Sequence, residues 1–87
     1  MNRYPLTCQQ IQERLLEHNP EARPREDDEN DISHTLWMIQ QIQNVLDEQG
    51  KIDRWIGWVM AKAHSLEVIS LSEARDWSRQ DVCQAST

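Results

Sequence analysis

The chain has 87 residues, which suits one domain with a single modest hydrophobic core and leaves little room for an enclosed substrate cleft. Its formal charge of −6 argues against a nucleic-acid binder that depends on a basic patch, and against attraction to an anionic membrane. Only two glycines occur and phenylalanine is absent, whereas helix-forming Gln, Glu, Leu, Ile and Ala are plentiful. This composition predicts an all-α fold.

The sequence also bears on the compartment. No run of 18 apolar residues occurs, and the N-terminal residues lack the apolar stretch of a signal peptide, so no membrane association and a cytoplasmic location are expected. Cys8 and Cys83 are too few for a disulfide scaffold. In a reducing cytosol both are expected to remain thiols.

The first helix is expected over residues 8–18. Thr7 and Gln10 have the spacing of a capping box, in which the threonine side chain is the N-cap. The dipeptide Asn19-Pro20 should end the helix, because proline disfavours helical geometry in the preceding residue and cannot donate to the hydrogen-bond ladder.

Residues 20–31 form an acidic loop with two prolines, six acidic residues and two arginines. The simplest interpretation is a solvated segment that keeps the protein soluble. The functional interpretation is an acidic arm that docks on a basic partner, with Asp27, Asp28 and Glu29 as candidate contacts. Calcium binding is not expected, since the spacing and central glycine of an EF-hand loop are absent.

Two long helices should follow, over residues 32–49 and 51–64, with Gly50 in the C′ position between them. The near-absence of a loop there indicates a tight antiparallel hairpin, which we favour, or a single long helix kinked at Gly50. The apolar residues of each recur at helical spacing, as expected for core-facing stripes. The stripes comprise Ile32, Leu36, Ile39, Ile42 and Leu46, broadened by Met38 and Val45, and then Ile52, Trp55, Ile56, Val59, Met60 and Ala63.

A fourth helix is expected over residues 71–80, opened by a capping box of Ser70 and Glu73. Leu71, Ala74 and Trp77 should face the core. Residues 84–87 are expected to be a frayed tail. The whole chain is therefore predicted to be a single small bundle of about four helices.

No constellation of catalytic or metal-binding residues is evident. His18, His34 and His64 fall on three different predicted helices, and no CxxC, HxxxH or HExxH motif brings two metal ligands onto one turn. The GxSxG, P-loop and GxGxxG motifs are absent as well. We therefore expect no enzymatic activity, no bound metal and no cofactor.

Four tryptophans are the most informative residues for function. Trp55 and Trp77 lie on apolar stripes and are expected in the core. Trp37 points nearly opposite the stripe of its helix, so either the first helix covers it or it is exposed as a binding anchor. Trp58 lies at the edge of its stripe and should be half-buried with a cation–π neighbour. The candidate partner-binding residues on the helices are Trp37, Trp58, Arg54 and Lys62.

Residues 54–79 contain two short strings, Arg54-Trp55-Ile56-Gly57-Trp58 and then Leu71, Glu73, Arg75 and Asp76 at the start of the next predicted helix. With these strings the chain resembles small helical accessory proteins of bacteriophages and prophages. The resemblance implies a protein that binds and redirects a host component, including defence systems such as CRISPR complexes. It implies no catalytic residue.

Small size, acidity, surplus tryptophan and the lack of catalytic motifs together favour a non-enzymatic module that binds a host protein and modulates or inhibits it. A self-associating structural module, in effect a homodimer, is the alternative. An acidic nucleic-acid mimic is a further alternative. Direct binding of nucleic acid is not expected.

Overall fold

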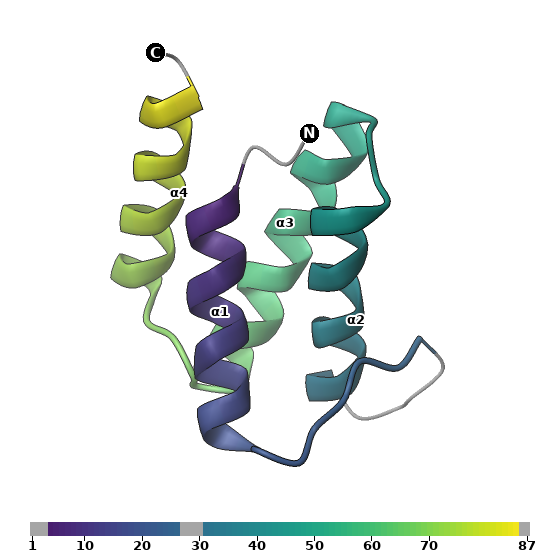
Figure 1. Cartoon of the computed structure of the whole chain (residues 1–87). Helices are drawn as coiled ribbons and strands as arrows, with labels where there is room; N and C mark the ends of the chain where they lie inside the picture. The colour runs from purple at the N-terminus through teal and green to yellow at the C-terminus, as the bar shows by residue number, and fades with distance from the viewer. Residues whose placement is uncertain (1–3, 27–30, 86–87) are drawn as a thin grey trace.

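The computed structural model describes residues 4–26 and 31–85, which form four helices and no strand (Figure 1). Successive helices alternate in direction, so that the start of α1 and the C-terminal end of α4 lie at the same end of the molecule. The predicted all-α bundle is confirmed. The helices are α1 (Pro5–His18), α2 (Asp31–Asn44), α3 (Gln49–Ser65) and α4 (Leu71–Ala85).

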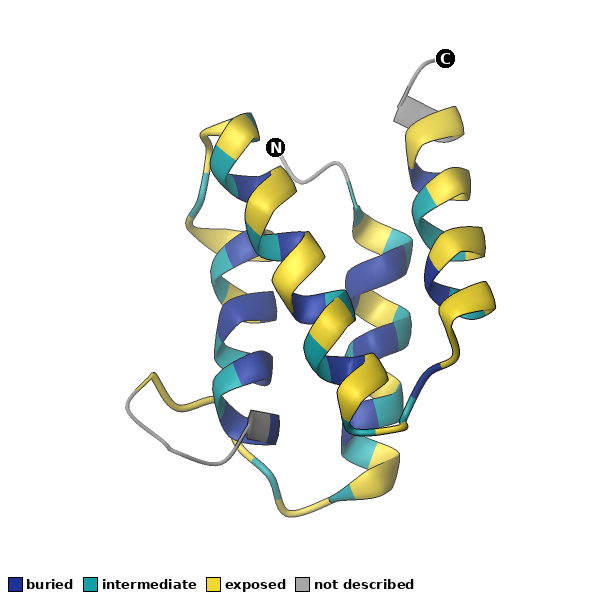
Figure 2. Cartoon of the chain, turned by 180° about the vertical axis from the view of Figure 1, so that it is seen from behind, coloured by how far each residue is buried: buried dark blue, intermediate teal, exposed yellow. Residues whose placement is uncertain are grey.

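Helix α1 is the hub of the packing. It contacts each of the other three helices, while α2 and α3 pack against each other as an antiparallel pair. Helix α4 packs mainly on α1 and makes at most marginal contact with α3. Seen from behind, α3 is in front and α4 stands to one side of it, tilted away toward its C-terminal end (Figure 2).

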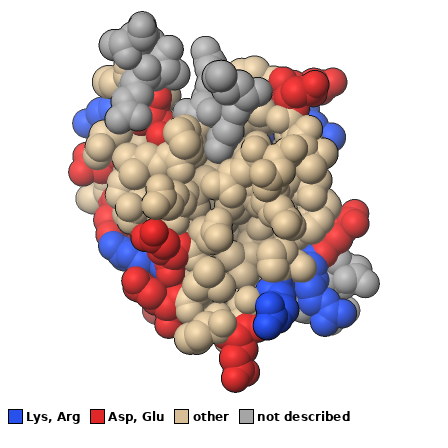
Figure 3. Space-filling view, viewed as in Figure 1, with Lys and Arg blue, Asp and Glu red and all other residues tan. Residues whose placement is uncertain are grey.

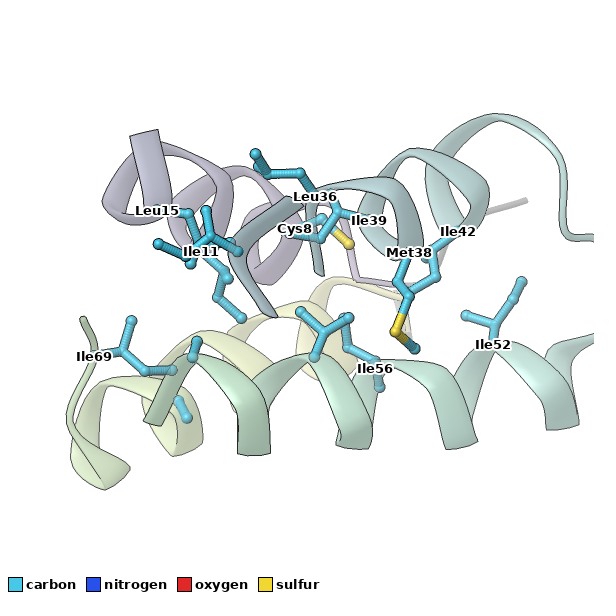
Figure 4. Close-up of a cluster of buried hydrophobic side chains, with 14 residues drawn as sticks. Cys8, Ile11, Leu15, Leu36, Met38, Ile39, Ile42, Ile52, Ile56 and Ile69 are labelled. Carbon is cyan, nitrogen blue, oxygen red and sulfur yellow. The ribbon is translucent and has the colours of Figure 1, made fainter. Parts of the chain in front are cut away.

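A single cluster of buried apolar side chains joins these helices, as the close-up in Figure 4 shows. The predicted stripes of α2 and α3 supply most of it, and α1 adds the residues that fall at its own helical spacing. Among the described residues after α3, Ile69 in the connector and Ala74 are the fully buried members of this cluster. The remaining core residues are Cys8, Ile11, Leu15, Ile32, Leu36, Met38, Ile39, Ile42, Ile52, Ile56, Val59 and Ala63.

The predicted capping box at the start of α1 is wrong. The helix begins at Pro5, in a position where the missing N–H of proline costs nothing, and Tyr4 is an N-cap without a side-chain hydrogen bond. Thr7 is fully buried inside the helix. The acceptor comes instead from Asp81 of α4, whose buried carboxylate accepts from the backbone N–H groups of Leu6 (3.0 Å) and Thr7 (2.8 Å) and from the Thr7 hydroxyl (2.6 Å).

The hairpin between α2 and α3 differs from the predicted one. Helix α2 ends at Asn44, where the N–H groups of Val45 and Leu46 both donate to the Gln41 carbonyl at 2.9 Å. Val45 is consequently 63% exposed and does not broaden the core stripe. Helix α3 already begins at Gln49, so Gly50 lies in its first turn and is not a C′ residue.

The second capping box is confirmed. The Ser70 N–H donates to the Glu73 carboxylate (3.0 Å), and the Glu73 N–H donates to the Ser70 hydroxyl (3.1 Å). Helix α4 starts at Leu71 as predicted, but Leu71 is 53% exposed and does not face the core. The helix continues to Ala85, beyond the predicted end at residue 80, so part of the expected frayed tail is helical.

An ion pair and a capping motif hold the α3–α4 connection. Arg14 binds the Glu73 carboxylate at 2.5 Å and donates to the Val68 carbonyl at 3.3 Å. Glu67 adopts a left-handed backbone conformation (φ 61°) after the end of α3. The N–H groups of Glu67 and Val68 then donate back to the carbonyls of His64 and Ala63, which is the Schellman pattern.

The carboxylate of Asp81 is expected to be a major source of stability. Replacing Asp81 by alanine should lower the free energy of unfolding by about 2–3 kcal/mol, because three donors at the start of α1 lose a charged acceptor. Urea denaturation followed by circular dichroism measures this loss. Asp76→Ala, an exposed change on the same helix, should stay within about 0.5 kcal/mol of the parent. Equal losses in the two variants would contradict the capping role of Asp81.

Glu73 should make stability depend on pH. Its pKa lies below the ordinary value because the Ser70 backbone N–H and then the Arg14 side chain bind the ionised carboxylate. A lowered folded-state pKa stabilises the fold above the unfolded pKa of about 4.3, and this stabilisation disappears as the pH falls through the folded value. Glu73→Gln should therefore be less stable than the parent near neutral pH, and the difference should vanish in acid. Glu17→Gln, a change at an exposed position, is the control. Denaturation at several pH values should show only a small difference in free energy of unfolding between this variant and the parent, and the difference should not vanish selectively in acid.

Candidate protein-binding face

Three of the predicted binding residues lie together on successive turns of α3. Trp58 is 61% exposed, which is more than the half-buried position expected for it. Arg54, one turn before it, is exposed, and Lys62, one turn after it, is half-buried. Tryptophan and arginine are both enriched among the residues that dominate binding at protein interfaces.

The other predicted binding residues are not part of this group. Trp37 is half-buried on α2, stacked on His34 with ring centroids 5.5 Å apart and tilted against Trp55 of α3 at 5.7 Å. Trp37 is therefore not an exposed anchor, and the ring of α3 that packs against it was not predicted. The candidate contacts Asp27, Asp28 and Glu29 lie outside the described residues.

Two tryptophans expected in the core are edge residues that pack under cations. Trp55 and Trp77 are both half-buried. The Lys51 ammonium lies 5.5 Å from the Trp55 ring centroid, and the Arg14 guanidinium lies 5.6 Å from that of Trp77. Both indoles lie at the rim of the core, where the cations that rest on them can stay in contact with water.

A largely apolar groove of about 390 Å³ runs along the surface between α3 and α4. The groove exists because α4 packs mainly on α1 and makes at most marginal contact with α3. Two of the α3 residues that line it, Gly57 and Ala61, are also very small. Its floor and walls include Gly57, Met60 and Ala61 of α3, and Leu71, Ala74 and Ser78 of α4.

The ionisable residues that line this groove are His64 and Arg75, and no carboxylate is among them. The sequence from residue 54 to 66 contains no acid, although the chain has 15 acidic residues. Arg54 and Arg75 have no ion-pair partner among residues 4–26 and 31–85. On the opposite side of the molecule, where α1 faces the viewer, acidic and basic groups both lie around the margin of a largely uncharged centre (Figure 3).

Large exposed apolar side chains concentrate near the same groove. Leu71 lines it, and Val82, one turn after Ser78, is 52% exposed on the same side of α4 by helical spacing. Trp58 lies next to Gly57 on α3. We call this surface the α3/α4 face, and it consists of Arg54, Gly57, Trp58, Ala61, His64, Leu71, Arg75, Ser78 and Val82.

Gly57 is not needed by the fold. A Cβ atom added there would meet nothing within 4 Å. Glycine inside a helix costs about 1 kcal/mol relative to alanine, so its presence on an open helix surface favours a role outside the chain. Without a side chain at this position, a second backbone can approach α3 closely.

Other surface features are less suited to a function. Among the described residues, no group of three or more His, Cys, Asp or Glu could hold a metal ion. A polar pocket beside Ser65 and Ser70 is occupied at one wall by the Arg14–Glu73 ion pair. Within the same ranges, no helix is long and apolar enough to cross a membrane.

The sequence indicated only part of the α3/α4 face. Arg54 and Trp58 were identifiable from their residue types, whereas Leu71 was expected in the core and Arg75 was not singled out as a binding residue. The signal that could have found the rest is the stretch of 13 residues without an acid in an acidic chain, together with a glycine inside a strongly periodic helix. The chain matches no protein-family model, and comparisons with curated proteins and with solved structures found no match.

Filling the gap at Gly57 should stabilise the isolated protein. Gly57→Ala is expected to raise the free energy of unfolding by about 1 kcal/mol, because helix propensity improves and the added methyl group meets no neighbour. The reverse change one turn later, Ala61→Gly, should lower it by a similar amount. Thermal and urea denaturation measure both. A less stable Gly57→Ala protein would show that the fold itself requires this glycine.

Proposed function

We propose that the protein is a non-enzymatic module that binds another protein through the α3/α4 face. The observation that carries this proposal is the exposure of Trp58, one turn from Arg54, beside a groove whose lining contains no carboxylate. Leaving an indole 61% exposed is unfavourable in an isolated small domain, and such residues are typical centres of interfaces.

The proposed biological setting rests on the resemblance of residues 54–79 to bacteriophage and prophage accessory proteins. In that setting the protein acts in the bacterial cytoplasm, where it binds a host protein and modulates or inhibits it. A component of a defence system, such as a CRISPR complex, is one such target. The resemblance and the α3/α4 face involve the same residues, which supports treating the two together.

Charge favours a different protein as the partner over a second copy. In a symmetric dimer the same patch lies on both sides of the interface, so Arg54 and Arg75 of one copy would approach those of the other. Like charges brought together in an interface cost free energy. A nucleic-acid mimic would place carboxylates on its binding surface, and the α3/α4 face has none.

The proposal is tested by comparing two variants that alter equally exposed apolar residues. Trp58→Ala removes the anchor, and Val45→Ala changes a residue that is 63% exposed in the α2–α3 loop. Tagged proteins are used to capture partners from bacterial lysate, which are quantified by mass spectrometry. We expect the parent and Val45→Ala to retain one stoichiometric partner, and Trp58→Ala to recover at least about tenfold less of it.

Folding must be unaffected for this comparison. Both changes are on the surface and should alter the free energy of unfolding by no more than about 0.5 kcal/mol, which circular dichroism verifies. Equal recovery of the partner by all three proteins would place the binding site elsewhere. Recovery of no partner by any of them would refute the proposed function.

A further inference from the structure

We infer that the groove between α3 and α4 binds an amphipathic helix of another protein, with an apolar face and Asp or Glu residues along its flanks. This inference rests on the proposed function and specifies the kind of partner. Its basis is the combination of an apolar floor, small residues at helical spacing, and Arg75 in a lining that contains no carboxylate.

The shape of the groove fits a helix. Two helices already form its walls, and Gly57 and Ala61 are four residues apart, so they lie on one face of α3, one turn from each other. Small residues in this arrangement let a second helix approach to the short end of the usual interaxial range of about 8–10 Å. From Gly57 to His64 the groove extends for about 10 Å, which accommodates about two turns of a docked helix.

The position of Trp58 agrees with such a partner. Trp58 follows Gly57 directly, so it projects about 100° around α3 from the line of small residues. A helix seated over Gly57 and Ala61 would therefore have the indole on one flank and Leu71 of α4 on the other. Both of these exposed side chains would become buried on binding.

Charge selects acidic flanks. Arg75 and His64 line the groove, Arg54 lies one turn from Trp58, and Asp76 is displaced from Arg75 by about 100° around α4. Glu73, which precedes the lining residue Ala74, is bound to Arg14. Asp53 lies one turn before Gly57 and accepts hydrogen bonds from Tyr4 and Gln49. A partner with carboxylates beside its apolar face therefore pairs with Arg54 and Arg75 without meeting a carboxylate of the groove.

An apolar floor distinguishes this site from a phosphate-binding surface. Nucleic-acid sites depend on many basic and hydrogen-bonding groups that follow the backbone, whereas here the residues between the basic walls are Gly57, Met60, Ala61 and Ala74. Burying them against a helix removes apolar surface from water, and phosphates would not do so.

The test uses three synthetic peptides of 18 residues. Two share one apolar face of Leu and Ala and differ only in carrying Glu or Lys at every flanking position. The third has the composition of the Glu peptide in a scrambled order without an amphipathic face. Binding to the full-length ¹⁵N-labelled protein is followed by amide chemical shifts. The chain has two glycines, so Gly57 reports on the groove and Gly50, which lies outside it, is an internal control.

We expect the Glu peptide to shift the amide signals of Gly57, Ala61 and Ser78 and to leave that of Gly50 unchanged. The Lys and scrambled peptides should bind at least about tenfold more weakly. Gly57→Leu fills the open space above α3 and should weaken binding of the Glu peptide about tenfold or more. Gly50→Leu is the same substitution in the same helix, at a position where an added Cβ also meets nothing within 4 Å, and it should bind like the parent.

A charge reversal gives a second, independent variant. Arg75→Glu should reduce binding of the Glu peptide and increase that of the Lys peptide, because the sign of the groove wall is inverted. Arg23→Glu changes the net charge by the same amount in the exposed linker after α1, and it should leave the preference unchanged. This pair separates a local effect at the groove from the overall charge of the chain.

Several results would overturn the inference. The Lys peptide could bind as tightly as the Glu peptide, or Gly57→Leu could bind like the parent. Shifts at Gly57 that appear with rising protein concentration alone would assign the groove to a second copy, and shifts caused by a DNA or RNA oligonucleotide would assign it to nucleic acid. If no peptide binds but capture from lysate still depends on Trp58, the proposed function stands and the helical partner is wrong.

Discussion

The buried carboxylate of Asp81 at the start of α1 determines where the last helix lies. It replaces the missing local cap of α1 and lies where the partial positive charge of a helix N-terminus is concentrated. At the other end of α4, Arg14 binds Glu73. Because α1 and α4 run antiparallel, these two contacts attach α4 to α1 at both ends.

This attachment has a consequence for the surface. Because α4 packs on α1, it does not cover α3, and the side of α3 opposite the core remains exposed next to α4. The groove between α3 and α4 results from the packing of α4 on α1. Its apolar residues, among them Leu71, would be core residues if α4 packed on α3.

The proposed binding surface differs in sign from the net charge of the chain. The overall charge is −6, while Arg54 and Arg75 lie on the α3/α4 face. On the proposed function, attraction to an acidic partner would be local, whereas the net charge would oppose the association of two copies.

The sequence by itself determined the helical class, the core stripes of α2 and α3 and the Ser70–Glu73 cap. Each of these depends on residues within a few turns of one another, whose spacing is visible in the chain. Thr7, Trp37 and Leu71 were misplaced, because their surroundings are supplied by Asp81, Trp55 and the open side of α3. Only the tertiary structure decided these positions. The carboxylate that Thr7 binds belongs to Asp81, 74 residues away in the chain, and helical periodicity does not say which helices become neighbours.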